Sequence, residues 1–333
     1  MDDSPAVGDG NAADLLQHYI GQSRATNTSR TYRAQWQAFQ TWCTTKTRAY
    51  APATPETVAL YLAERAQAGA APSSIAVALA AIQFAHDQTG VPLRREDPVL
   101  RLVLDGIRRA HIRPQRQAEP LRKELLDDIL RSTGASAVEQ RDGVLLALLF
   151  LFGLRASEVV ALDWMSVGAG NGWLLIKDDV LEVGLCGSKA AGQCVERLAV
   201  PAHTCPGAVR AMQSWAELAQ LRQGQPVLRA LARGGAIRPH RLHANSVSSI
   251  VKGAVARHLV GRGALAEDAQ IEAGRFSGHS GRVGLYVSAT EAGAPAQHIA
   301  ALARHKSMAM VLRYARQADL LACSPHAWLQ PGV

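Results

Sequence analysis

A basic stretch with two prolines divides the sequence into two regions, each of which needs a hydrophobic core of its own. Between Arg101 and Lys123, seven basic side chains face only two acidic ones, and Pro114 and Pro120 lie in the second half of the stretch. Proline interrupts helices, and such a composition is typical of an interdomain linker. A chain of 333 residues is long enough for two domains. We therefore expect a disordered N-terminus over residues 1–11, a helical domain over 12–110, a linker over 111–120 and a second domain over 121–333.

The first region carries apolar side chains at the spacing of helices. Trp36, Phe39 and Trp42 recur every three residues, and a second periodic segment follows Pro55. Apolar residues three or four positions apart share one face of a helix, which usually packs into a core. The pattern predicts a bundle of four or five helices. We interpret its aromatic side chains as core residues rather than as a platform for nucleic-acid bases.

The second region alternates between helical and strand-like patterns. An almost continuously apolar segment over residues 141–152 predicts a buried helix, and Gly153 suits the left-handed position that ends one. Three short β-type runs follow, at 173–177, 181–186 and 196–200, before helical patterns return. The expected fold class is mainly α, with an N-terminal helical bundle and an α+β C-terminal domain that contains a small antiparallel β-sheet.

The composition favours a polyanionic partner and gives no sign of a membrane segment. Lys and Arg outnumber Asp and Glu by 36 − 28 = 8. A surplus of this size favours a polyanion, although charge alone does not separate DNA from RNA or from a membrane surface. The apolar run over 144–154 is too short to cross a bilayer. The first residues lack the basic and apolar regions of a signal peptide, so we expect a cytoplasmic protein.

Cysteines and histidines do not predict a metal site. The five cysteines are isolated and form no C-x-x-C pair, which is typical of free thiols. Arg238, His240, Arg241 and His243 form a basic cluster without neighbouring carboxylates or thiols. Contact with a DNA backbone is therefore the favoured interpretation of this cluster.

A series of polar residues lies at the ends of the expected elements of the second region. They are, in order, Arg155 and Glu158 after the buried helix, Lys189 in a glycine-flanked turn, His279 and Arg282 at a helix start, His305 between two helices and Tyr314 at the end of the last one. Each alone is weak evidence, because an H-x-x-R is a common accident and a tyrosine that ends a helix is usually a core residue. The complete order is informative because all these residues fit one reaction on a phosphodiester.

In these residues the sequence resembles the tyrosine recombinases and integrases, and within them it is most similar to the Cre-type recombinases. The resemblance runs from about Gly153 to Arg316, and the helical first region fits less specifically. The family's first arginine motif matches Gly-Leu-Arg155-Ala-Ser-Glu158, its β-turn lysine matches Lys189, its H-x-x-R matches His279 and Arg282, its histidine-or-tryptophan position matches His305, and its nucleophile matches Tyr314. Val283 stands where many integrases carry a second histidine, which makes this segment Cre-like.

The residue types suit the chemistry that the resemblance implies. A phosphodiester reacts slowly because its charge repels nucleophiles and its alkoxide leaving group is poor. The guanidinium forks of Arg155 and Arg282, with a hydrogen bond from His305, would neutralise the charge that grows on the non-bridging oxygens. A tyrosine has an ordinary pKa of roughly 10, so Tyr314 must lose its proton as it attacks. His279 is the candidate base.

The resemblance also assigns the supporting roles. Lys189 would protonate the departing 5′ oxygen, and Glu158 would orient Arg155 or His279. Lys177 is the alternative to Lys189, which we favour because glycines flank its turn whereas Lys177 falls within an expected strand. The implied products are a 3′-phosphotyrosine and a free 5′-hydroxyl. Because the phosphotyrosine conserves the energy of the broken bond, the reaction needs no metal, no ATP and no other cofactor.

The implied partners are specific recombination sites in double-stranded DNA and further copies of the chain. The resemblance implies a homotetramer on two sites, with a dimer on each, acting at the nucleoid with or without accessory proteins and without a membrane. Integration, excision and resolution of a mobile element or replicon all remain open. The expected DNA contacts are Arg108, Arg109, Arg113, Arg116, Arg238 and Arg241. A solvated linker is the alternative for the first four.

The segment after Tyr314 carries more apolar residues than a free tail needs, including Leu320, Leu321 and Trp328. It can fold back on its own domain or dock into a neighbouring protomer, and the resemblance favours docking. Three other functions are also considered: a type IB topoisomerase or hairpin telomere resolvase with the same fold, a non-catalytic DNA-binding regulator, and a metal-dependent nuclease. The complete polar series disfavours a regulator, and the lack of clustered carboxylates disfavours the nuclease.

Overall fold

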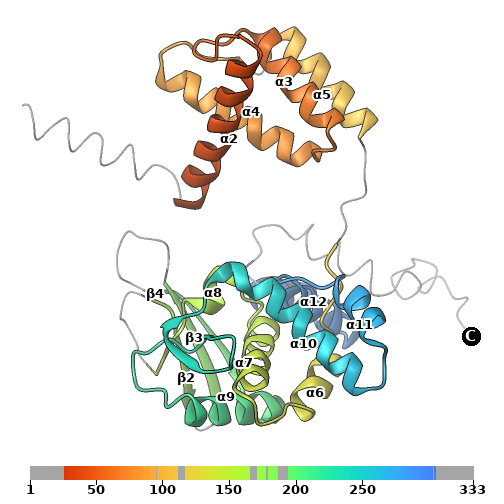
Figure 1. The fold of residues 1–333 in the computed structure, drawn as a ribbon. Helices are drawn as coiled ribbons and strands as arrows, with labels where there is room; N and C mark the ends of the chain where they lie inside the picture. Colours follow the sequence, from red (N-terminus) through yellow and green to blue (C-terminus); the bar gives the residue numbers. More distant parts are fainter. Residues whose placement is uncertain are drawn as a thin grey trace, which may run out of the picture. The chain divides into compact units, whose positions relative to one another are not determined.

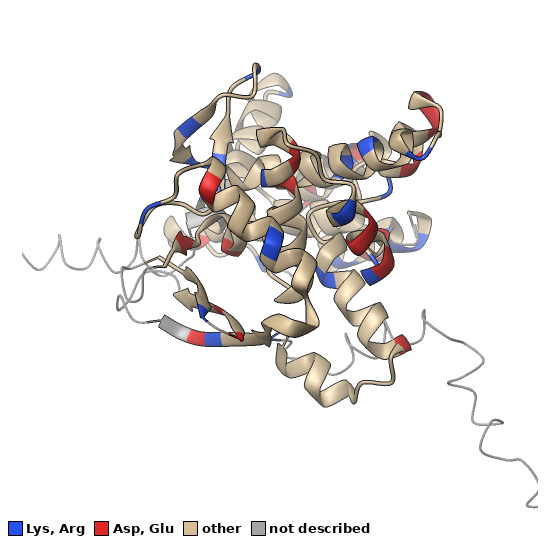
Figure 2. Ribbon diagram, turned by 90° about the horizontal axis from the view of Figure 1, so that it is seen from below, with Lys and Arg blue, Asp and Glu red and all other residues tan. Residues whose placement is uncertain are grey.

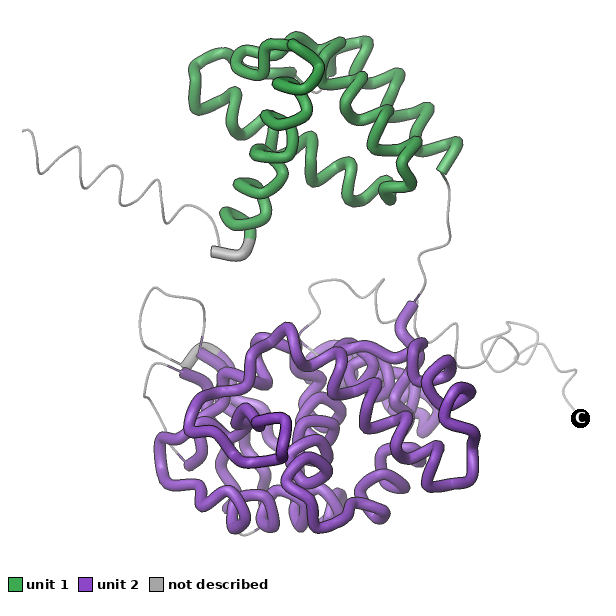
Figure 3. The backbone as a smooth tube through the Cα atoms, viewed as in Figure 1, with its two compact units in different colours: residues 1–115 green, residues 116–333 purple. Residues whose placement is uncertain are grey.

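The chain forms two compact units, residues 1–115 and 116–333 (Figure 1, Figure 3). The computed structural model describes residues 26–94, 96–111, 117–165, 171–177, 179–186, 194–302 and 304. Within those residues, no helix has both the length and the apolar character that crossing a membrane requires.

Unit 1, where the structure describes it, is a bundle of the helices α2 (Thr26–Thr45), α3 (Pro55–Gln67), α4 (Pro72–Gln88) and α5 (Pro98–Ala110). The last three helices all begin with proline, whose fixed φ suits the first helical position and which leaves no N–H unpaired there. Phe39 and Leu62 are fully buried, and Trp36 and Trp42 pack against the same core. The prediction that these aromatics belong to the core is confirmed.

Unit 2 is built around one buried helix. Its helices are α6 (Lys123–Arg131), α7 (Ala137–Leu151), α8 (Ala156–Val160), α9 (Pro206–Leu218), α10 (Val247–Gly261), α11 (Ala266–Ala273), α12 (Ser280–Glu291) and α13 (Ala296–Leu302), with short 3₁₀ turns at Ala202–Thr204 and Ala244–Ser246. Helix α7 contacts α6, α8, α9, α10 and α12 (Figure 1). It ends at Gly153, which has a φ of 55°, so the prediction of a left-handed glycine is confirmed.

A four-stranded sheet lies beside these helices, in the order β1 (Asp163–Trp164), β2 (Trp173–Lys177), β3 (Val180–Cys186) and β4 (Cys194–Pro201). The β1–β2 pair is parallel, whereas β2–β3 and β3–β4 are antiparallel. The three predicted strands correspond to β2, β3 and β4, and the predicted fold class is confirmed. The sequence patterns did not predict a second sheet, formed by β5 (Arg229–Leu231) and β6 (Ile237–Arg241), or the helix α11.

Helix α12 packs against its neighbours almost backbone to backbone. A Cβ atom at Gly281 would lie 2.6 Å from Leu149 Cβ, and one at Gly284 would lie 1.8 Å from the carbonyl oxygen of Leu121. The Leu121 N–H donates to the carbonyl oxygen of Ser280 over 2.9 Å, so this contact is also hydrogen-bonded. The glycines therefore let α12 lie directly on α7 and on the segment that enters α6.

Candidate active site

Arg155 lies immediately before α8, where the chain leaves the buried helix α7. Its N–H donates to Glu158 Oε2 over 2.7 Å, which satisfies a free donor at the start of the helix. Its Nη1 donates to Glu158 Oε1, also over 2.7 Å. Half of the Arg155 side chain is nevertheless exposed. The carboxylate thus holds both the backbone and one nitrogen of the guanidinium, while half of the side chain stays accessible from outside.

Arg282 is held from within the fold. It lies on α12, it is 2% exposed, and its Nη1 donates to the carbonyl oxygen of Gly153 over 2.8 Å. Its Nε donates to the hydroxyl of Tyr286 over 2.9 Å. Because Gly153 is two residues before Arg155, this bond holds Arg282 next to the turn that carries Arg155. A buried guanidinium with fixed partners is preorganised and does not need to rearrange when substrate arrives.

His279 is the N-cap residue of α12, close enough to both arginines for their charges to act on its ring. Partial removal of its ring from water lowers the pKa of His279, and the nearby charges of Arg282 and Arg155 lower it further. The imidazole of the free protein therefore stays neutral at a pH where an ordinary histidine begins to charge. A neutral ring is the form that can accept a proton.

Glu158 is shared between Arg155 and Arg304, which follows α13. Arg304 donates from Nη2 to Glu158 Oε2 over 2.6 Å and from Nη1 to Oε1 over 3.2 Å. Burial raises the pKa of Glu158, but the hydrogen bonds from Arg304 and Arg155 outweigh it, so its pKa is below the ordinary value. Arg304 has a φ of 54°, a left-handed conformation that costs a residue other than glycine about 1–2 kcal/mol. Its contacts with Glu158 offset that cost.

Lys189, His305 and Tyr314 lie outside the described residues. Arg304, which precedes His305, also lies 3.4 Å from Glu196 of β4. Glu196 pairs with Leu185, next to the end of β3 from which the chain continues toward Lys189.

The register of the sheet separates Lys177 from Glu196. Lys177 pairs with Val180 at the start of β3, whereas Glu196 pairs with Leu185 near its other end. Five residues of strand at about 3.3 Å each place these two pairs roughly 16 Å apart along the sheet. The end that leads to Lys189 is therefore the one that contacts Arg304.

The predicted DNA contacts differ in how far they are available. Arg108 and Arg109 are exposed in the last turn of α5, and Arg238 is exposed on β6. Arg241 is instead bonded inside unit 2, to Asp163 Oδ1 over 2.5 Å and to two backbone carbonyl oxygens. These bonds join β6 to the end of α8 and the start of β1, so Arg241 is less available than the other described arginines of this group, and its predicted DNA contact stays a prediction. Arg113 and Arg116 lie outside the described residues.

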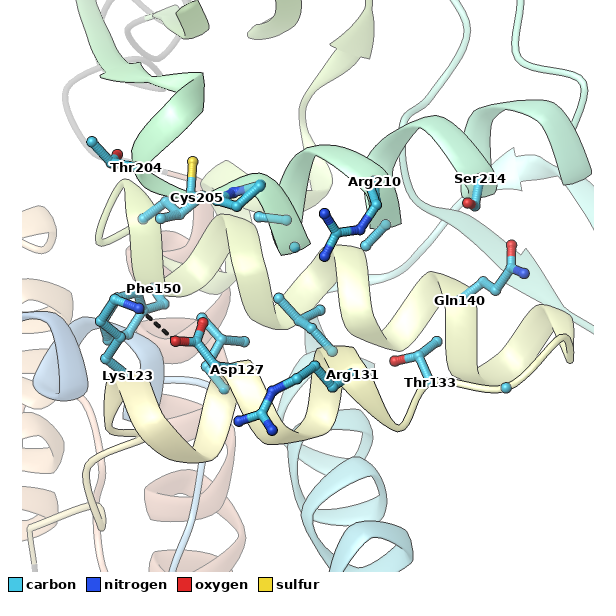
Figure 4. A pocket seen from close by; sticks show the side chains of 18 residues that line it. Lys123, Asp127, Arg131, Thr133, Gln140, Phe150, Thr204, Cys205, Arg210 and Ser214 are labelled. Atoms are coloured by element: carbon cyan, nitrogen blue, oxygen red, sulfur yellow. Dashed lines mark hydrogen bonds and ion pairs between the residues drawn. The ribbon is translucent and has the colours of Figure 1, made fainter.

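Neither the charge distribution nor the pockets alone would have located this cluster. Basic side chains are spread among acidic ones over many elements (Figure 2). A pocket between α6, α7 and the start of α9 is lined by residues such as Lys123, Asp127 and Arg210, and by no predicted catalytic residue (Figure 4). In the described part of the chain, no group of three or more His, Cys, Asp or Glu side chains is arranged to hold a metal ion. The cluster is recognised by the bonds that join its members.

Comparison with known proteins identifies the family of the chain. Residues 119–320 match the phage integrase family, and residues 13–86 match the phage integrase N-terminal SAM-like domain. The chain belongs to the phage integrase family. This integrase-family protein is therefore a tyrosine recombinase, of the class that breaks and rejoins DNA. The family resemblance stated from the motifs is confirmed.

Curated relatives of this recombinase are similar to it over different lengths. It is 30% identical to the integrase/recombinase XerD homolog of Selenomonas ruminantium over 316 residues, which cover 90% of this chain and 84% of the relative. It is 29% identical to the tyrosine recombinase XerD of Yersinia pestis over 159 residues, which cover 46% of this chain and 50% of that protein.

Solved structures share the fold of this recombinase. The Tn1549 transposon integrase in complex with circular intermediate DNA has a TM-score of 0.56 and 14% identity, covering 91% of this chain and 92% of that one. A lambda integrase dimer bound to a core site has a TM-score of 0.54 and 14% identity, covering 94% and 96%. At this identity the similarity establishes the fold alone.

Arg304 is the member of the cluster that sequence reasoning missed. No family motif quoted above includes it, and an arginine next to a histidine has no distinctive pattern. The available signal was its position directly before His305 in a chain segment with a second base, Lys306.

Proposed function

We propose that this protein is a site-specific recombinase that cleaves DNA with Tyr314 and forms a 3′-phosphotyrosine. The observation that carries the proposal is the convergence of Arg155, His279 and Arg282. Arg282 donates to the carbonyl oxygen of Gly153, two residues before Arg155, and the charges of both arginines lower the pKa of His279. Two guanidiniums beside a neutral imidazole can stabilise a phosphorane-like transition state and accept the proton of an attacking phenol.

The proposed reaction balances without a metal ion or ATP. The Tyr314 oxygen forms a bond to phosphorus while the bond from phosphorus to the 5′ oxygen breaks. His279 accepts the phenolic proton, and Lys189 gives a proton to the departing 5′ oxygen. In the second half of the reaction a 5′-hydroxyl of the partner duplex gives its proton to Lys189 and attacks the phosphotyrosine. The bond from phosphorus to Tyr314 breaks, and His279 returns the proton to the phenol oxygen. The number of phosphodiester bonds is unchanged.

The sheet supports Lys189 over Lys177 as the proton donor. Arg304 bonds Glu158, the partner of Arg155, and also lies near Glu196, at the end of the sheet that leads to Lys189. Lys177 is the last residue of β2 and pairs with Val180, at the opposite end of β3. A proton donor must reach the leaving oxygen within hydrogen-bond distance, so the nearer end is the better source.

The proposed working form is a homotetramer that joins two DNA sites, with a dimer on each. We propose that phosphates are contacted by Arg108, Arg109, Arg113, Arg116 and Arg238. The segment after Tyr314 docks into a neighbouring protomer. The domains and the linker have the limits given in the sequence analysis. Among proteins with the same fold are a transposon integrase with circular intermediate DNA and an integrase dimer on a core site. Integration, excision or resolution of a mobile element or replicon, at the nucleoid in the cytoplasm, is the corresponding biological role.

Covalent trapping tests the proposal. The full-length protein is incubated with nicked fragments of DNA from its source, with EDTA present, and protein-linked DNA is recovered under denaturing conditions and sequenced. We expect a recurrent site that carries protein on a 3′ phosphate, and no such product from Tyr314→Phe. Lys189→Ala should abolish cleavage of an intact site, whereas Lys177→Ala should cleave normally. Covalent product from Tyr314→Phe, or protein on a 5′ end, would refute the mechanism.

A further inference from the structure

We propose that Arg304 is a positioning residue, which ties three chain segments of the active site together through Glu158 and Glu196. The proposal rests on the function proposed above. Arg304 bonds Glu158 at the start of α8, lies within 3.4 Å of Glu196 on β4, and directly precedes His305. In the sequence, these three segments are next to Arg155, Lys189 and His305.

The exposures of the two arginines on Glu158 separate their roles. Half of the Arg155 side chain is exposed, so it can reach a phosphate, whereas the Arg304 side chain is only 10% exposed. The Arg304 guanidinium is directed to carboxylates on both α8 and β4. It therefore acts on the substrate through its partners and is not itself a catalytic residue.

Charge balance gives Arg304 a second effect. If Glu158 paired with Arg155 alone, its negative charge would largely cancel the positive charge that has to face the phosphate. Arg304 donates to both oxygens of the same carboxylate. Arg155, Arg304 and Glu158 together keep a net charge of +1. Glu196 offsets this charge only in part, because it is half exposed, lies 3.4 Å away and is screened by water, so Glu158 orients Arg155 without neutralising it.

The backbone conformation of Arg304 indicates that this position needs the arginine side chain and not only a residue that can form the turn. Its φ of 54° is a conformation that glycine adopts more easily than arginine. Replacing Arg304 by glycine therefore removes both carboxylate contacts while relieving the backbone. This makes Arg304→Gly a variant that should fold at least as readily as the alternatives and still test the ion pairs.

The first measurement uses the free protein and does not depend on any DNA reaction. Carboxyl carbon NMR follows the titration of Glu158 in the wild type, in Arg304→Gly and in Arg304→Lys, and hydrogen exchange follows the amide of His305. We expect the Glu158 midpoint to rise and the His305 amide to exchange faster in Arg304→Gly, with partial restoration in Arg304→Lys. An unchanged midpoint and unchanged exchange would overturn the proposal, whether or not the protein recombines DNA.

The second measurement is single-turnover cleavage of a nicked duplex that carries the trapped site. Since a displacement of about 1 Å in an active site can cost 100-fold in rate, we expect Arg304→Gly to cleave roughly 10- to 100-fold more slowly with unchanged DNA affinity. Arg262→Gly is the matched control, because Arg262 also pairs with a carboxylate, Asp128, but is 69% exposed. Equal cleavage rates for Arg304→Gly and the wild type, or a loss explained wholly by weaker DNA binding, would contradict the proposal. Product from Tyr314→Phe would instead refute the proposed function.

Discussion

Replacing Gly284 with alanine tests how closely α12 must lie on the rest of unit 2. The new Cβ would lie 1.8 Å from the Leu121 carbonyl oxygen, and ordinary contact begins at 3.4 Å. The helix and the Leu121 segment must therefore separate by 3.4 − 1.8 = 1.6 Å. Both groups in the clash are backbone, so no side-chain rotation relieves it. The separation also breaks the 2.9 Å hydrogen bond between Leu121 and Ser280.

The magnitude follows from these two losses. Overpacking in a core typically costs about 1–3 kcal/mol, and a lost buried hydrogen bond adds about 1 kcal/mol. We expect Gly284→Ala to lower the free energy of unfolding by about 3 kcal/mol or more. Because Arg282 lies two residues away on the same helix, cleavage of the trapped site should fall by roughly 100-fold even where the variant remains folded.

Urea unfolding followed by circular dichroism measures the stability, and single-turnover cleavage below the unfolding transition measures the activity. Gly261→Ala is the control, since a Cβ at this last residue of α10 meets nothing within 4 Å. It should change the free energy of unfolding by no more than about 1 kcal/mol, in the stabilising direction. Equal stabilities for Gly284→Ala and the wild type would show that α12 does not need this close approach.

Three further predictions concern charge. In the free protein the ring of His279 should titrate below the ordinary histidine pKa of about 6.5. This histidine therefore favours folding above pH 6.5 and opposes it as the pH falls from there toward the lowered pKa of the folded state. An NMR midpoint at or above the ordinary value would contradict this. Asp142→Ala should cost about 3–5 kcal/mol in urea unfolding because it leaves Arg141, 7% exposed, without its carboxylate partner, and a loss below 1 kcal/mol would show that the pair is not needed. Arg241→Ala should lower stability, whereas Arg238→Ala should weaken DNA binding and its salt dependence at unchanged stability; the reverse result would support Arg241 as a DNA contact.

Periodicity predicted the elements whose side chains alternate between core and solvent or share one buried face. The strands β2 and β3 were predicted because their inward residues, such as Leu174 and Val183, are apolar and buried. The hairpin β5–β6 was missed because β6 is largely exposed and contains Pro239, which is unfavourable in most strands. Helix α11 was missed because it is short and exposes its largest apolar residue, Ile271.

The sequence supplied candidate site residues one by one, but it did not predict the bonds that connect them. The order of the motifs was enough to select Arg155 and Arg282, because the chemistry demands cations near a phosphate. Their contact through Gly153 depends on how closely α12 packs, which no local pattern contains. The ion pair between Glu158 and Arg304 joins residues 146 positions apart, so it belongs to the tertiary structure alone.

The segment around Glu119 limits how unit 1 can be exchanged for the N-terminal unit of another protein. Glu119 N–H donates to the Arg275 carbonyl oxygen and Leu121 N–H to that of Ser280, on either side of His279. A fusion junction at or after Glu119 would cut into the backbone support of the histidine itself. Grafts joined upstream of that residue keep the support intact, and their recombination activity would then report on the new unit's DNA preference.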